Sequence, residues 1–201
     1  MQNNISHHSS NPQKEILRLI YPQWQGGDIA GWFGDLSQSE ASQGYILGAQ
    51  ILNLIVDCIL SSSEHSTIAP SKAHSAYSSK HHTAIVPINR DFIVDDSGHR
   101  IVQEGIIDKE VLASQTKSAL EILSTHKPAK ILTLGGECAI SVPPFTYLAQ
   151  MYKDEIAMVW IDAHPDIALP NDDFYKGYHA MAVSAIIGKG GLKESFSLPS
   201  H

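Results

Sequence analysis

Residues 156–166 read Ile-Ala-Met-Val-Trp-Ile-Asp-Ala-His-Pro-Asp, an apolar run followed at once by three side chains that can bind metal. A short, unbroken apolar run bounded by polar residues is typical of a strand buried on both faces, so we expect a strand over 156–161. Pro165 cannot donate a ladder hydrogen bond, and it biases the residue before it toward an extended conformation. The strand is therefore expected to end where the ligand-type side chains begin.

The segments around this stretch predict the fold class. Apolar runs are expected to form strands over 84–88 and 130–134, and helical spacing of apolar residues predicts helices over 40–60, 108–126, 143–152 and 179–187. Strands that alternate with helices predict an α/β fold of three layers, α/β/α, with a mostly parallel sheet. Asp108 is expected to cap its helix. The remaining segments are expected to be irregular: residues 1–13 frayed, 14–40 rich in turns, and 61–82 a flexible Ser- and His-rich loop.

Composition limits the classes of partner. The chain has 201 residues, 43% of them hydrophobic, which suits one globular domain. Its net charge of −7 without a basic cluster argues against nucleic acid or an anionic membrane as a partner. We expect no membrane span, because no run of 18 apolar residues occurs, and no signal peptide. Two cysteines are too few for a disulfide framework, so a cytoplasmic location is expected.

Asp162, His164 and Asp166 are candidate metal ligands. On an extended chain Asp162 and His164 point to the same side, whereas Asp162 and Asp166 would lie about 13 Å apart. Either the chain bends after Pro165, or the three residues serve two ions about 3.5–4 Å apart. Two carboxylates and an imidazole suit Mn²⁺. Each residue could instead be a turn cap, a half-buried histidine or a solvated acid, but their concentration after one strand favours metal binding.

The Asp-Ala-His-Pro-Asp segment, with a Gly-Gly strand end about 25 residues before it, resembles the ureohydrolase family of arginases and agmatinases over about 130–188. The resemblance implies a binuclear Mn²⁺ site in which Asp162 bridges both ions, His164 binds one and Asp166 the other. A metal-activated hydroxide would then cleave a C–N bond of a small cationic guanidino or amidino substrate. His179 matches the family histidine that shuttles protons to the leaving amine. A homo-oligomer is also implied.

Two departures from the family pattern keep alternatives open. The family's Gly-Gly-Asp-His is Gly135-Gly136-Glu137-Cys138 here. Cys138 could bind metal, could favour a softer metal, or could be a small buried residue without a ligand role. The family's later Asp-x-Asp pattern does not occur in the 201 residues, so we expect one arginase-like domain over 1–201 that lacks the C-terminal strands.

These departures leave two hypotheses for function. The first is a metal-dependent hydrolase of linear amidines, and the second is a non-catalytic family protein or inactive fragment. A nucleotide-binding domain is disfavoured because no G-x-G-x-x-G or G-x-x-x-x-G-K pattern follows a strand. The acidic run at 171–173 could favour a cationic substrate, although such runs are more often solvated turns.

Overall fold

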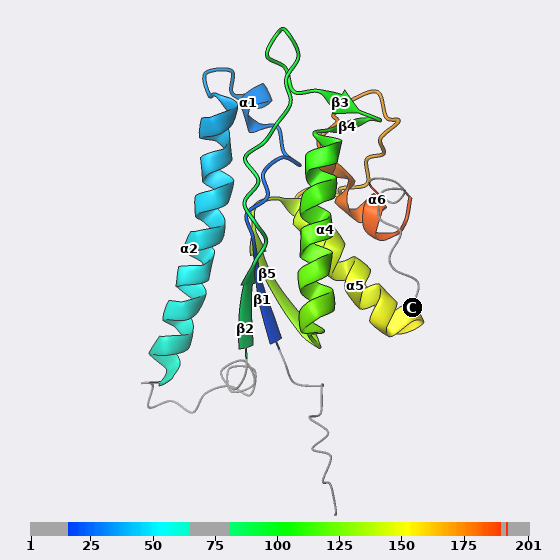
Figure 1. The fold of residues 1–201 in the computed structure, drawn as a ribbon. Coiled ribbons are helices and arrows are strands. Elements are labelled where there is room, and N and C mark those ends of the chain that lie inside the picture. The colour runs from blue at the N-terminus through cyan, green and yellow to red at the C-terminus, as the bar shows by residue number, and fades with distance from the viewer. Residues whose placement is uncertain (1–15, 65–80, 190–191, 193–201) are drawn as a thin grey trace, which may run out of the picture.

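The computed structural model describes residues 16–64, 81–189 and 192 (Figure 1). Its centre is a parallel sheet in the order β2-β1-β5, formed by β1 (Ile16–Tyr21), β2 (His81–Ile85) and β5 (Lys130–Gly135). A small antiparallel pair, β3 (Val102–Gln103) and β4 (Ile106–Ile107), lies apart from this sheet.

Helices cover both faces of the sheet. The α-helices are α1 (Ile29–Trp32), α2 (Gln38–Glu64), α4 (Lys109–His126), α5 (Val142–Tyr152) and α6 (Ala182–Ile186). Short 3-10 turns are η2 (Cys138–Ser141), η3 (Lys153–Glu155) and η4 (Tyr178–Met181). Helix α2 packs on one face of the sheet, and α4 and α5 pack on the other (Figure 1). The expected three-layer α/β fold with a parallel sheet is thereby confirmed.

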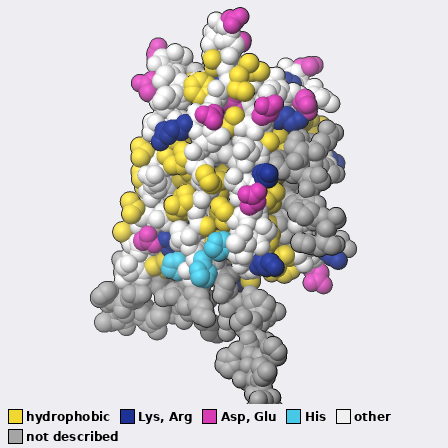
Figure 2. Space-filling view, viewed as in Figure 1, with side chains coloured by type: hydrophobic (Ala, Val, Ile, Leu, Met, Phe, Trp, Pro, Cys, Tyr) yellow, Lys and Arg dark blue, Asp and Glu magenta, His cyan; other side chains and the backbone are white. Residues whose placement is uncertain are grey.

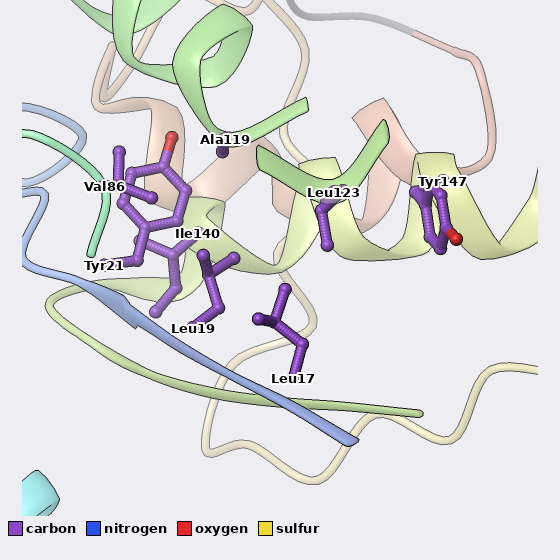
Figure 3. Close-up of a cluster of buried hydrophobic side chains, with 8 residues drawn as sticks. All are labelled: Leu17, Leu19, Tyr21, Val86, Ala119, Leu123, Ile140 and Tyr147. Atoms are coloured by element: carbon purple, nitrogen blue, oxygen red, sulfur yellow. The ribbon is translucent and has the colours of Figure 1, made fainter. Parts of the chain in front are cut away.

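Strand β1 is buried along its whole length because its side chains alternate between the two helical layers. Leu17, Leu19 and Tyr21 point toward α4 and α5, where they pack against Leu123 and other buried side chains (Figure 3). Arg18 points to the opposite face, toward α2. The hydrophobic core that supports the sheet therefore lies mainly between β1 and the α4–α5 layer.

The irregular structure expected over 14–40 is wrong at residues 16–21, which form the central strand, at 29–32, which form α1, and from 38 on, where α2 begins. Arg18 interrupts the apolar run, and a buried charge is rare in a strand that is covered on both faces. The structure shows how the charge is accommodated. The Arg18 guanidinium donates to Asn53 Oδ1 of α2 at 2.8 Å and forms an ion pair with Asp57.

The strand expected over 156–161 is not formed, because no strand of the described chain pairs with this segment. Alternate residues nevertheless differ in burial, as they do along a strand. Trp160 is half-buried and packs against a second core cluster, whereas Val159 and Ile161 are 79% and 93% exposed. The apolar pattern thus indicates a segment that suits a sheet. In the described part of the chain this segment has no neighbouring strand to pair with, and such pairing is what defines a strand.

Most of the other expected elements are found, with shifted boundaries. The helices expected at 108–126 and 143–152 are confirmed as α4 and α5, and the one at 40–60 as part of α2. The loop expected over 61–82 is wrong at both ends, since α2 continues to Glu64 and β2 begins at His81; the part between lies outside the described residues, as do residues 1–13. The helix expected at 179–187 is divided between η4 and α6.

Helix α2 carries a broad apolar surface that faces away from the sheet. Its exposed residues include Leu47, Ile51, Leu54, Ile55 and Ile59, and hydrophobic side chains gather along that side of the molecule in Figure 2. Contrary to the expectation of no membrane span, Gln38–Ser61 is long and apolar enough to cross a membrane by length and composition. This is weak evidence for a span, because core helices of soluble proteins meet the same criterion.

Candidate metal centre

Two glycines at the end of β5 bring the first candidate ligand to the carboxyl edge of the sheet. A Cβ atom added to Gly135 would lie 2.4 Å from the Tyr21 carbonyl oxygen, and one added to Gly136 would lie 1.7 Å from that of Gln23. Only glycine therefore allows β5 to leave the sheet this close to the end of β1. Cys138 follows directly, at the edge where open α/β sheets bind ligands.

Glu137, the residue before Cys138, has a structural role. Its buried carboxylate accepts hydrogen bonds from Gln23 Nε2 and, at 2.7 Å, from the backbone N–H of Ala139 in η2. Burial raises the pKa of Glu137 to about 7. Because both carboxylate oxygens accept protein hydrogen bonds, Glu137 fixes the start of η2 and with it the position of Cys138.

Cys138, Asp162 and Asp166 come together in one cluster. One ligand atom from each lies within 4.8 Å of the other two, and Cys138 Sγ is 3.6 Å from Asp162 Oδ2. Asp166 is 5% exposed, and its Oδ2 has no hydrogen-bond partner among the residues that the structure describes. Burial raises the pKa of Asp166 and of the Cys138 thiol. The cluster thus brings three acidic groups together at one place.

A bend in the backbone brings the two aspartates together. Asp166 has φ +47°, in the left-handed region, and its carbonyl oxygen accepts from the N–H of Val183 at 3.0 Å. Ala168 N–H donates to the Ala180 carbonyl at 2.9 Å, which ties the chain after the bend to η4. Of the two alternatives raised by the sequence, the bent chain is the one observed, and Asp162 and Asp166 are within reach of a single ion.

His164 lies at the rim of this cluster and outside it. Its imidazole is 81% exposed, and Nδ1 is 3.9 Å from Asp162 Oδ1. Its backbone N–H donates to the same Asp162 oxygen at 3.0 Å, which lowers the pKa of that carboxyl. Asp162 therefore caps a turn with one oxygen while its other oxygen contacts Cys138. The predicted ligand role of His164 stays a prediction.

His179 approaches the cluster from η4. Its backbone N–H donates to the Gly26 carbonyl at 3.1 Å, and its ring centroid is 5.2 Å from that of Tyr175. Burial lowers the pKa of His179, and the negative charge of Asp166 partly opposes this shift. A half-buried imidazole beside the acidic cluster can exchange protons there, as predicted for a shuttle, although this role stays a prediction.

Sequence reasoning missed the group that holds the loop after β1. Buried Arg100 donates to the carbonyl oxygens of Gln25 and Gly27, and its Nε lies 2.9 Å from Asp108 Oδ2. Asp108 was expected to cap α4; it stands at the cap position with φ +50°, but its carboxylate is used by Arg100. No local pattern could have paired Arg100 with residues far away in the sequence.

Comparisons with known proteins identify the family of the chain. The sequence model of the arginase family matches residues 51–198. Over 100 residues the chain is 30% identical to an arginase of Neurospora crassa. The matched region makes up 47% of this chain and 27% of the fungal protein. Over 85 residues the chain is 27% identical to an arginase of Plasmodium berghei. This matched region makes up 41% of this chain and 24% of that protein.

Solved arginases share the fold at low sequence identity. The Entamoeba histolytica arginase in complex with L-ornithine superposes with a TM-score of 0.62 at 12% identity, covering 94% of this chain and 54% of that one. The native arginase of Bacillus caldovelox gives 0.62 at 17% identity, covering 92% and 54%. The α/β fold is therefore the fold of these solved arginases. The chain belongs to the arginase family, and it spans about a quarter of the curated relatives and half of the solved ones.

Proposed function

We propose that this chain contributes a site for hydrolysis of a C–N bond in a small, linear guanidino or amidino compound. The observation that carries the proposal is the convergence of Cys138, Asp162 and buried Asp166 at the carboxyl edge of the sheet. A divalent ion held there would supply Lewis acidity, which activates water and polarises the substrate. The cytoplasmic location and homo-oligomeric assembly expected from the sequence belong to the same proposal.

The chain's own residues support a cationic substrate and proton transfer. The aspartates place negative charge at the edge of the sheet, which attracts a guanidinium or amidinium group. His179 is mostly neutral at pH 7, because burial lowers its pKa, and it can accept a proton and pass it to a leaving amine. The ornithine in the Entamoeba enzyme is likewise a small amino compound. The acidic run at 171–173 contributes less, since Asp172 accepts from the Leu169 N–H in a local turn.

A non-catalytic family protein is the second candidate. The observation in its favour is that only three ligand atoms converge among the described residues, and one of them is a thiol. That donor set does not fit the Mn²⁺ pair implied by the family resemblance, because two dications need more charge neutralisation and more ligands.

An assay of the purified chain separates the two candidates. Release of urea, ammonia or formamide is measured from arginine, agmatine, guanidinobutyrate and formiminoglutamate after loading with Mn²⁺, Co²⁺ or Zn²⁺. Hydrolysis predicts metal-dependent release that Asp166→Asn abolishes and that His179→Gln reduces by about 10²-fold or more. No release from a chain that holds metal would reject hydrolysis in favour of the non-catalytic role, and equal release with and without metal would reject the metal-dependent mechanism.

A further inference from the structure

We propose that Cys138, Asp162 and Asp166 together bind one thiophilic divalent cation of the zinc class. This inference concerns the same site as the proposed function and rests on that assignment of the site. It differs from the family expectation in the number of ions, in the ligand set and in the kind of metal.

The spacing of Cys138 and Asp162 fits one ion. Zinc binds sulfur at about 2.3 Å and carboxylate oxygen at about 2.0–2.2 Å, so a tetrahedral site separates these two ligands by about 3.6 Å. The observed distance from Cys138 Sγ to Asp162 Oδ2 is 3.6 Å. The Asp166 ligand atom completes a group whose members lie within 4.8 Å of one another. Three protein ligands with a fourth position open is the usual arrangement of a catalytic zinc site.

The unsatisfied oxygen of Asp166 is an independent sign of a cation. Its side chain is almost completely buried, yet Oδ2 finds no hydrogen-bond donor in the described part of the chain. Buried polar groups almost always have a partner, because burying a polar group unpaired destabilises the fold, and burying a charged one unpaired does so more. A cation between Asp166 and Cys138 would provide that partner.

The chemistry of the donors selects the metal. Thiolates prefer zinc and other soft or borderline ions, whereas Mn²⁺ prefers carboxylate, carbonyl and water oxygens. The sulfur is held in place, since Glu137 fixes η2 by accepting from the Ala139 N–H. The imidazole that would favour a second ion belongs to His164, and it is largely exposed outside the cluster.

Metal binding by the complete 201-residue chain tests this inference without any assay of activity. The chain is stripped with a chelator and titrated with Co²⁺, whose thiolate complexes show a sulfur-to-metal charge-transfer band. We expect this band to saturate at one Co²⁺ per chain and to be displaced by Zn²⁺ but not by the same concentration of Mn²⁺. Elemental analysis after Zn²⁺ loading and desalting should give one ion per chain.

The two cysteines provide a matched pair of variants. Cys138→Ser should abolish the band and weaken Zn²⁺ binding by at least about tenfold, and Asp166→Asn should weaken binding similarly. Cys58→Ser, on the exposed side of α2, should leave both unchanged. Circular dichroism confirms that each variant is folded. Because Cys138→Ser differs from the wild type by one atom, it provides the test even where Asp166→Asn fails to fold.

The outcomes separate this inference from the proposed function. A sulfur band that depends on Cys138, without urea or ammonia release, would support the zinc-class site and count against hydrolysis. Two Mn²⁺ ions per chain, a Co²⁺ complex without the band, or a band that Cys58→Ser removes would overturn the inference. Release of urea by a chain with two Mn²⁺ ions would overturn it and support hydrolysis.

Discussion

At the scale of single residues, two buried ionisable side chains hold in place the chain segments that surround the metal-ligand cluster. Glu137 joins the loop after β1 to η2, and Arg100 joins the same loop to the start of α4. Both side chains are almost completely buried, so each one depends on the partners it has there. Substitutions that keep the shape of these side chains and change their charge therefore measure how much the side chains change the free energy of unfolding.

Glu137 should make stability fall as the pH rises. Its pKa is raised by burial from 4.5 to about 7, so its contribution to folding is complete below about pH 4.5 and is lost as the pH rises through 7. In chelator-treated protein, Glu137→Gln should remove this loss. The free energy of unfolding of the variant, relative to that of the wild type, should therefore be up to about 3 kcal/mol higher at pH 8 than at pH 4.5. Urea denaturation across this range checks the difference, and parallel curves for the two proteins would contradict it.

Asp108 should be essential for Arg100. Asp108→Asn leaves the buried guanidinium without its closest countercharge and should lower the free energy of unfolding by about 3 kcal/mol. The matched control is Glu121→Gln, which breaks an exposed pair with Lys117 and should cost less than about 0.5 kcal/mol. Chemical denaturation of both variants provides the measurement. Equal small losses would mean that the buried pair contributes no more than a surface pair.

At the scale of elements, local patterns predicted what local interactions determine. Helices α4 and α5 and strand β5 follow from the spacing of their apolar residues. Strand β1 could not be predicted in this way, because the burial of Arg18 depends on Asp57 of α2, and the local sequence carries no sign of that pairing. The segment 156–161 shows the reverse case, since it has the pattern of a strand and no strand beside it in the described part of the chain.

The same distinction applies to the site. Asp162, Asp166 and Cys138 could be recognised because each follows an apolar segment that ends at one edge of the fold. The left-handed turn at Asp166, which decides that one ion can reach both aspartates, depends on contacts with α6 and could not be predicted. The exposed position of His164 was unpredictable for the same reason.

The close approach of β1 and β5 should make Gly136 irreplaceable. Gly136→Ala places a methyl group against the Gln23 carbonyl and should destabilise the fold by about 2 kcal/mol or more. Gly48→Ala in α2 is the matched control. No atom lies within 4 Å of its added Cβ, and better helix propensity should stabilise it by up to about 1 kcal/mol. Thermal melts of both variants test the pair, and a loss at Gly48 as large as that at Gly136 would refute the steric explanation.

At the scale of the whole molecule, the described residues expose apolar side chains, among them those on the outer face of α2 and in the segment 156–161. Large exposed apolar patches favour association.

Polar substitution of the exposed side of 156–161 should therefore reduce self-association. The double variant Val159→Thr and Ile161→Thr should lower the weight-average mass in sedimentation while changing the free energy of unfolding by less than about 0.5 kcal/mol. Met158→Thr, on the half-buried side of the same segment, should instead destabilise the fold. Unchanged sedimentation of the double variant would show that this surface does not cause association.

The loop between β1 and α1 has a kinetic consequence as well. Its residues bond to Glu137, which is 114 positions away, to Arg100, about 75 positions away, and to His179 in η4. Contacts of such separation form slowly, because each requires closing a long stretch of chain. On a ribosome, where synthesis is directional, the cluster can be assembled only after Asp166 has left the exit tunnel, and the bend at Asp166 is tied down only once Val183 has followed. Until then Cys138 is an accessible thiol that oxidants can modify before the fold covers it.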